Sequence, residues 1–244
     1  MLDPGRSHST TVVTAMPVQP KTAIYLEVGT KRVFAGALEW PGWCRSGRDE
    51  GAALKTLVTY GARYKGALGR AARGLMVPAS VDGFDIVERL GGNATTDFGA
   101  PGVAPESDAR SLSDTELDRM TKLLRACWAA FDSAAEGAVG AVLRTGPRGG
   151  GRKLDAMVAH VLEADRAYLG GIGGSARKEG DADLAAEMAH VRAAILDAIA
   201  ARARGERPVI SSRRKAPIWS PRYTVRRSAW HALDHAWEIQ DRAH

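Results

Sequence analysis

The stretch WHALDHAWE, residues 230–238, lies near the end of the chain and decides how the rest is interpreted. On a helix, residues four positions apart share a face, so His231 and His235 would present two imidazoles side by side. Such a pair is a common way to hold one divalent metal ion. The chain has six histidines, and one pair at this spacing can also arise by chance. The assignment of a metal site therefore depends on a third ligand.

A helix is predicted around this pair. Ser220 and Pro221 supply an N-cap residue and a first-turn proline, and Trp230, Leu233 and Trp237 follow as an apolar stripe. The adjoining stripe is polar and contains Arg227, His231, His235 and Glu238.

Three more helices are predicted upstream. Ser113 and Glu116 form a capping box at the start of the first. The second runs from about residue 152 to 169, after a break at 146–151, and the third from about 183 to 204. The glycine-rich stretch 170–174 reads as a helix terminator, because no strand precedes it and no Lys-Ser/Thr ends it. These helices together predict a four-helix bundle.

The third ligand is His160, beside the apolar positions of the second helix. Metal sites in bundles are built from side chains of facing helices, and three protein ligands leave an ion one open position, as in catalytic sites. Arg227, one turn before His231, would hold an anionic group of a substrate. The carboxylates expected to accept hydrogen bonds from the imidazoles are Glu163, Asp165, Asp234 and Glu238. The alternative is that the histidines are ordinary polar edges of the helices.

The N-terminal part predicts a compact sheet-and-helix unit. Strands are expected at 23–28 and 32–37, a short third strand follows Cys44, a helix opens near Glu50, and a strand returns at 84–90. Residues 1–19 form a predicted tail in which 11–18 could add a strand. Residues 92–112, rich in Gly, Pro and Ser, are the predicted linker. The fold class is therefore α+β, with domains at 20–91 and 113–244.

Two cysteines in different predicted domains argue against a disulfide framework. Arg45 and Arg48 could lower the pKa of Cys44 and make it reactive. The favoured interpretation is a half-buried structural thiol at a strand end. Cys127 lies on the apolar stripe of the first predicted helix and is expected to be a core residue.

The composition, with 45% hydrophobic and 25% charged residues, is typical of a globular protein. No apolar run reaches the length of a signal peptide or a membrane span, so a cytoplasmic protein without membrane contact is expected. The net charge of +6 is modest, and the basic stretch around 207–215 is interpreted as a solvated connector. Nucleic acid is therefore not expected as a partner.

The passage ALEWPGWCRSGRDEGAA, residues 37–53, resembles HicB-like domains, which are small sheet-and-helix modules related to half an RNase H fold. The resemblance covers about 50 residues and implies the fold of the N-terminal unit. Antitoxins of that family usually carry a separate DNA-binding segment, which is not identifiable here. No cluster of acidic residues that would support nuclease chemistry is present either.

Residues 113–243 resemble the DinB-like superfamily of four-helix bundles, which have one His on the second helix and H-x-x-x-H on the fourth. The matching passages are HVLEADRAYL at 160–169 and RSAWHALDHAWEIQDR at 227–242. The resemblance implies that His160, His231 and His235 are metal ligands. Members with assigned roles include S-transferases and isomerases that use mycothiol or bacillithiol. Isolated bundles of this type often dimerise, which makes a homodimer one expected assembly.

The expected function is that of a bacterial metal-dependent transferase or isomerase that joins a low-molecular-weight thiol to a small electrophile. Arg227 and Glu238 are its candidate catalytic residues, and the metal is expected to be Zn, with Ni or Fe as alternatives. The other hypothesis is a non-catalytic metal-binding regulatory protein, in which the HicB-like unit binds a partner and the basic 202–227 region meets nucleic acid.

Overall fold

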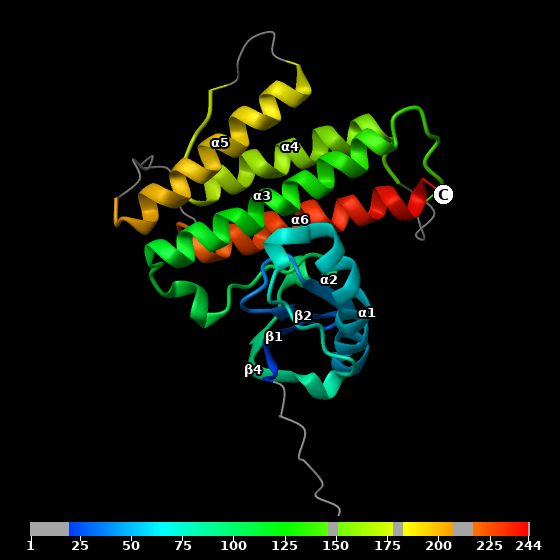
Figure 1. Ribbon diagram of the computed structural model, residues 1–244, viewed down its shortest axis with the longest axis vertical. Coiled ribbons are helices and arrows are strands. Elements are labelled where there is room, and N and C mark those ends of the chain that lie inside the picture. Colours follow the sequence, from blue (N-terminus) through cyan, green and yellow to red (C-terminus); the bar gives the residue numbers. More distant parts are fainter. Residues whose placement is uncertain (1–19, 146–150, 178–182, 207–216, 244) are drawn as a thin grey trace, which may run out of the picture.

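The computed structural model of the chain describes residues 20–145, 151–177, 183–206 and 217–243. The fold is α+β: a four-stranded mixed sheet comes first and long helices follow it (Figure 1). The predicted tail at 1–19, most of the predicted break at 146–151 and the basic stretch at 207–215 lie outside the described residues.

The sheet has the strand order β3-β2-β1-β4. Strand β1 pairs with β2 in antiparallel and with β4 in parallel orientation, and the parallel pair is reached through helix α1. The predicted order of three strands, a helix and a returning strand is therefore confirmed. The elements of this unit are β1 (Thr22–Val28), β2 (Val33–Ala37), β3 (Cys44–Gly47), α1 (Glu50–Leu68) and β4 (Phe84–Gly91), with short 3-10 turns η1 (Gly69–Ala72) and η2 (Val81–Gly83).

Helix α1 covers the sheet because its apolar residues recur every three or four positions. Asp49 begins the helix by accepting a hydrogen bond from the backbone N–H of Ala52. Trp43 fills the space between helix and sheet: it is fully buried, its indole N–H donates to the carbonyl of Leu57 at 2.9 Å, and its ring stacks on Tyr64. Trp43 thus anchors the core of this unit.

The predicted linker at 92–112 contains two short elements, α2 (Ala94–Phe98) and the 3-10 turn η3 (Glu106–Ala109). The buried carboxylate of Glu27 on β1 holds the segment, because it accepts hydrogen bonds from the Thr96 hydroxyl and from the backbone N–H groups of Gly102 and Val103. The composition of 92–112 indicated an unstructured linker. The hydrogen bonds that order this segment come from Glu27, which is far away in the sequence, so local composition does not reveal them.

Four long helices lie side by side beyond this segment (Figure 1). They are α3 (Asp114–Gly137), α4 (Leu154–Gly171), α5 (Leu184–Ala203) and α6 (Pro221–Arg242). The capping box of Ser113 and Glu116 is present at α3, and Ser220 caps α6 with Pro221 in its first turn. Within the described residues, no helix is long and apolar enough to cross a membrane.

Helix α6 packs against both parts of the molecule, and sixteen of its 22 residues are buried. It contacts α3, α4, α5 and η3. The turn between β2 and β3 also reaches it: Gly42 has a φ of +92°, and a Cβ at this position would lie 2.9 Å from Leu233 Cδ1. Glycine is needed here for both the backbone conformation and the close approach. Most of the buried apolar residues of the sheet unit and of the helices form one continuous cluster, and Phe34, Cys44 and Trp230 form a second.

Candidate metal centre

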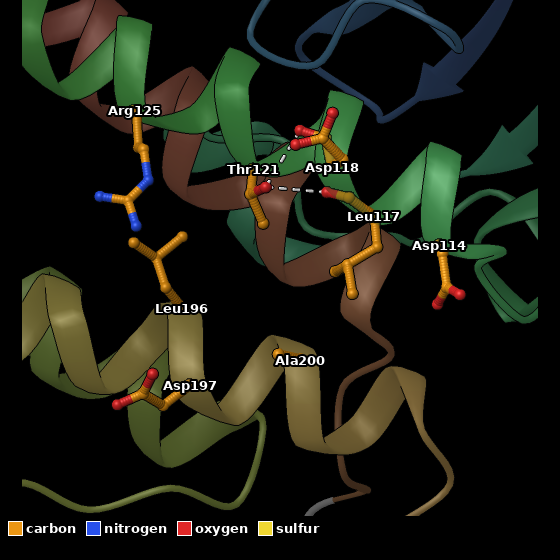
Figure 2. Close-up of a pocket in the computed structure, with 8 residues that line it drawn as sticks. All are labelled: Asp114, Leu117, Asp118, Thr121, Arg125, Leu196, Asp197 and Ala200. Carbon is orange, nitrogen blue, oxygen red and sulfur yellow. Dashed lines mark hydrogen bonds between the residues drawn. The ribbon is translucent and has the colours of Figure 1, made fainter.

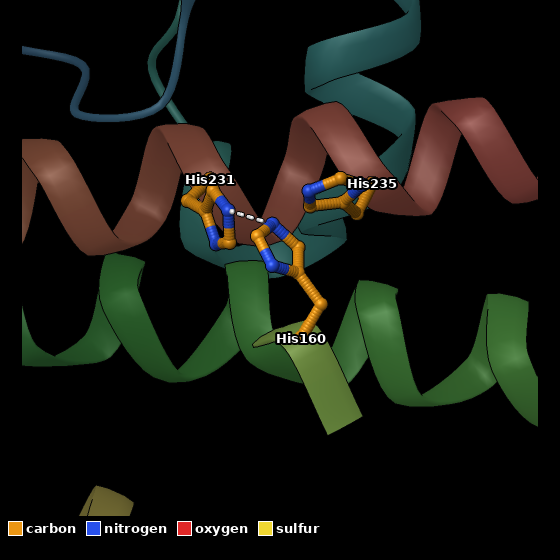
Figure 3. A group of neighbouring side chains, drawn as sticks. All are labelled: His160, His231 and His235. Carbon is orange, nitrogen blue, oxygen red and sulfur yellow. Dashed lines mark hydrogen bonds between the residues drawn. The ribbon is translucent and has the colours of Figure 1, made fainter. Parts of the chain in front are cut away.

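Three histidines converge at the contact between α4 and α6. Figure 3 shows His160 on α4 with its ring directed toward the rings of His231 and His235 on α6. One ligand nitrogen from each residue can be chosen so that all three lie within 4.8 Å of one another. The i, i+4 spacing on α6 places the pair on one face, and α4 brings the third ring to it. The structure therefore brings together all three histidines predicted as ligands.

The closest pair of nitrogens has the separation expected of two ligands on one ion. His160 Nε2 and His231 Nε2 are 3.3 Å apart. Two nitrogens bound tetrahedrally at the usual Zn–N distance are separated by about 3.3 Å. An N–H···N hydrogen bond between two neutral rings would give a similar distance. The approach of the third ring, His235, with its centroid 5.1 Å from that of His160, favours a shared ion.

The surroundings favour the neutral form of two of the imidazoles, which is the form that binds metals. Burial lowers the pKa of His231 well below its usual value, and the neighbouring His235 and Arg227 act in the same direction. Burial is also the main cause that lowers the pKa of His160, although this side chain is partly exposed. The cluster is thus open at His160 and enclosed at the other two histidines, which are 7% and 8% exposed.

Glu238 provides the outer contact of His235. Its carboxylate lies 3.0 Å from His235 Nδ1, which directs the other nitrogen, Nε2, toward the cluster. Arg242 holds the same carboxylate at 2.8 Å from the next turn of α6. The hydrogen bond with His235, followed by the contact with Arg242, lowers the pKa of Glu238. The predicted outer role of this residue matches its position.

The other three carboxylates predicted to support the histidines have different surroundings. Asp165 is buried and contacts Arg192 and Ser228, whereas Asp234 pairs with Arg45 of β3 at 2.7 Å. Glu163 is exposed and has no hydrogen bond among the described residues. The expected contacts of these three residues with the imidazoles are therefore wrong, since their partners lie on other elements.

One imidazole nitrogen is left without an outer partner. His231 Nδ1 is buried and has no hydrogen bond within the part of the chain that the structure describes. If Nε2 binds an ion, the ring proton resides on Nδ1. The donor set consequently fits a metal through its three converging nitrogens, whereas the described residues provide an outer carboxylate acceptor only at His235.

Arg227 lies one turn before His231, as the sequence indicated, and its guanidinium packs against aromatic rings. Its Cζ is 4.9 Å from the ring centroid of Trp230 and 5.6 Å from that of Tyr168. Tyr168, on α4 two turns beyond His160, also approaches the ring of His231 at 5.7 Å. The sequence interpretation missed Tyr168; its place on the helix of His160 was the available signal.

Cys44 is not a reactive thiol. It is buried in the sheet unit, and burial raises its pKa to about 12, more than Arg45 and Arg226 lower it. Arg45 does lower the pKa of Cys44, but burial has the larger effect. The favoured interpretation of a structural thiol is therefore supported, although the thiol is fully rather than half buried. Cys127 is fully buried in α3, as expected, and its pKa is also raised by burial.

A surface groove lies between α3 and α5, away from the histidines. It has a volume of about 340 Å³ and includes Asp118, Arg125 and Asp197 in its lining (Figure 2). None of the three histidines contributes to it. The groove and the histidine cluster are thus separate features.

No family model, curated protein or solved structure matches the chain. The class defined by the fold and the site is accordingly an α+β protein with three histidines that could hold a metal ion.

Proposed function

We propose that α3–α6 form a DinB-like four-helix bundle and that the protein is a metal-dependent transferase or isomerase acting with a low-molecular-weight thiol. The observation that carries this proposal is the convergence of one nitrogen each from His160, His231 and His235. Three neutral nitrogen donors suit Zn, with Ni and Fe as alternatives. The resemblance of residues 160–169 and 227–242 to the DinB-like pattern supports the choice of reaction.

A divalent ion at this position supplies positive charge that favours the thiolate form of a bound thiol near neutral pH. The residues of the chain orient and enclose the reactants. His231 and His235 form the enclosed wall, and the partly exposed His160 marks the side of entry. Glu238 fixes the ring of His235.

In the proposed transfer, the thiol proton passes to solvent and the sulfur forms a bond to an electrophilic carbon. The leaving group departs from that carbon with the bonding electron pair. In an isomerisation, the sulfur adds to the substrate and leaves again after rotation about the carbon–carbon bond, so that the thiol is regenerated.

Metal analysis of the untagged full-length protein tests the proposal. We expect about one equivalent of divalent metal per chain, as for three-histidine sites in general, and loss of the metal in His231→Ala. His190→Ala is the matched control, because His190 lies on α5 outside the cluster. Protein without metal, or unchanged metal content in folded His231→Ala, would contradict the proposal.

A second candidate is a non-catalytic metal-binding protein that regulates a partner through its HicB-like unit. The low exposure of His231 and His235 favours it, because a closed metal site is typical of a structural role. Within the basic 202–227 region, Arg222 and Arg226 are buried in ion pairs with Glu116 and Asp108, so they are not free to meet nucleic acid. Metal binding without any thiol binding would select this candidate.

A further inference from the structure

Arg227 differs from the other arginines of α6. Arg222, Arg226 and Arg242 each form an ion pair with a carboxylate. Arg227 has no ion pair and no hydrogen bond among the described residues, and its Nη1 atom is buried. A buried guanidinium nitrogen without an acceptor is energetically costly. Its persistence here calls for a partner that the described residues do not supply.

The surroundings of Arg227 and of the histidine cluster are shared. The rings of Trp230 and Tyr168 pack against the guanidinium, and the same two rings approach His231 with centroid distances of 6.1 and 5.7 Å. Aromatic faces hold a planar guanidinium in a fixed orientation. The charge of Arg227 is therefore held one helical turn from the metal ligands, beside two largely apolar walls.

The local charge balance favours an anion. The three imidazoles are neutral donors, so an ion bound to them keeps its full positive charge. Arg227 adds a second positive charge, and no carboxylate among the described residues pairs with it. A guanidinium fork matches the two oxygens of a carboxylate.

We propose that Arg227 is an anion-binding residue for the ligand of the histidine cluster, and that this ligand carries a carboxylate. The inference rests on the proposed function and deepens it by naming the chemical class of the ligand. Either the thiol or its electrophilic partner carries the carboxylate.

A bound water is the alternative partner of Nη1. Arg227, Trp230 and Cys44 help to line a cavity of about 10 Å³, which has room for at most one water molecule. This cavity is too small for a carboxylate ligand, so in this proposal the anion lies on the side of the histidines. If a water in the cavity is the partner of Arg227, the protein should bind anionic and neutral ligands equally well. If Arg227 binds the anion, the protein should bind the anionic ligand more tightly, and the two affinities can be compared.

The test uses the full chain loaded with Co²⁺, whose absorption reports thiolate binding without any assay of activity. Two matched probes are titrated, 3-mercaptopropionate and its neutral amide. We expect the acid to bind about tenfold more tightly than the amide, because it adds a charge-assisted hydrogen bond. Arg227→Gln should remove this preference and leave binding of the amide unchanged, which also shows that the variant is folded.

Two further variants define the cause. Arg227→Lys should retain part of the preference, because it keeps the charge and loses the fork. Arg125→Gln removes an exposed positive charge from the groove between α3 and α5 and should leave the preference intact. Mercaptoacetate repeats the comparison with a shorter spacer.

Propionate distinguishes the source of the carboxylate. If propionate binds together with the neutral thiol and this binding depends on Arg227, the carboxylate belongs to the electrophile. If the protein prefers the mercapto acid and does not bind propionate in this way, the carboxylate belongs to the thiol. Calorimetry of propionate with the metal-free protein tests Arg227 even if the metal proposal fails. Equal binding of acid and amide by the wild type, together with no Arg227-dependent binding of propionate, would overturn the inference.

Discussion

On the side of α6 that faces the sheet unit, the buried guanidinium of Arg226 has a carboxylate and two carbonyls as partners, whereas Arg227, beside the histidines, has no acceptor among the described residues. Arg226 pairs with Asp108 and donates to the carbonyls of Ala37 and Leu38. Facing α4, His231 Nε2 lies 3.3 Å from His160 Nε2, and Arg227 has no acceptor within the part of the chain that the structure describes. Partnered charges fix the packing of two parts of a fold, while unpartnered ones indicate a ligand.

The largest effect is expected on the partnered side. Arg226→Met leaves Asp108 buried without its cation and should lower the free energy of unfolding by about 3–5 kcal/mol. Urea unfolding measures it. Lys122→Met is the control, because Lys122 and Asp118 form an exposed i, i+4 pair worth about 0.5 kcal/mol or less. Equal losses in the two variants would show that the buried Arg226–Asp108 pair contributes no more to stability than an exposed pair does.

Asp165 on α4, which contacts Ser228 of α6, adds a pH dependence. Burial raises its pKa to about 6, despite the contacts with Arg192 and Ser228. The native state thus binds this proton more tightly than the unfolded state. The stability linked to this residue is complete below about pH 4 and is lost as the pH rises through 6.

The Asp165→Asn variant has no ionisable group at this position. Its free energy of unfolding, relative to that of the wild type, should therefore rise by up to about 3 kcal/mol as the pH increases from 4 to 7. Urea unfolding at several pH values measures this change. Asp132→Asn is the comparison, because Asp132 shares Arg192 but is more exposed. A difference between Asp165→Asn and the wild type that is constant with pH would show that Asp165 is ionised throughout.

On the ligand side, Glu238→Ala should weaken Zn binding about tenfold or more, because His235 loses the acceptor that orients it. Competition with a chromophoric chelator gives the affinity. Asp234→Ala is the matched control: it removes a carboxylate adjacent to His235 in sequence, but one that pairs with Arg45. Equal weakening in both variants would indicate a general charge effect rather than orientation of the ring.

The smallest effect is expected at the cysteines. Cys44 and Cys127 are both buried, with raised pKa values. A thiol reagent should therefore modify neither in the native protein and both after unfolding. Rapid modification of native Cys44 would show that the sheet unit opens locally, and it would place a reactive thiol on the partnered side.

The strands and helices could be predicted because their signals are local. The spacing of apolar residues, the capping box at Ser113 and the proline after Ser220 lie within a few positions of the elements they define. The three histidines were found in the same way, from spacing on α6 and from the pattern of the second predicted helix. Glu238 was found because its partner is three residues away on the same helix.

The partners of the remaining carboxylates could not be predicted, because the contacts span long stretches of chain. Asp165 pairs with an arginine 27 residues away, and the partner of Asp234 is 189 residues away. Helical spacing alone placed both near the histidines. The burial that governs the pKa of Cys44 likewise depends on how the sheet unit packs, which local spacing does not describe.

The position of α6 in the chain has a consequence for folding. Of the described elements, α6 comes last in the sequence, yet the sheet unit, α3 and α4 all pack on it. During synthesis these elements leave the ribosome before the helix that completes their shared core. Contacts between distant parts of a chain slow folding. We therefore expect the partly made chain to expose apolar surface until α6 emerges, and to depend on chaperones during that interval.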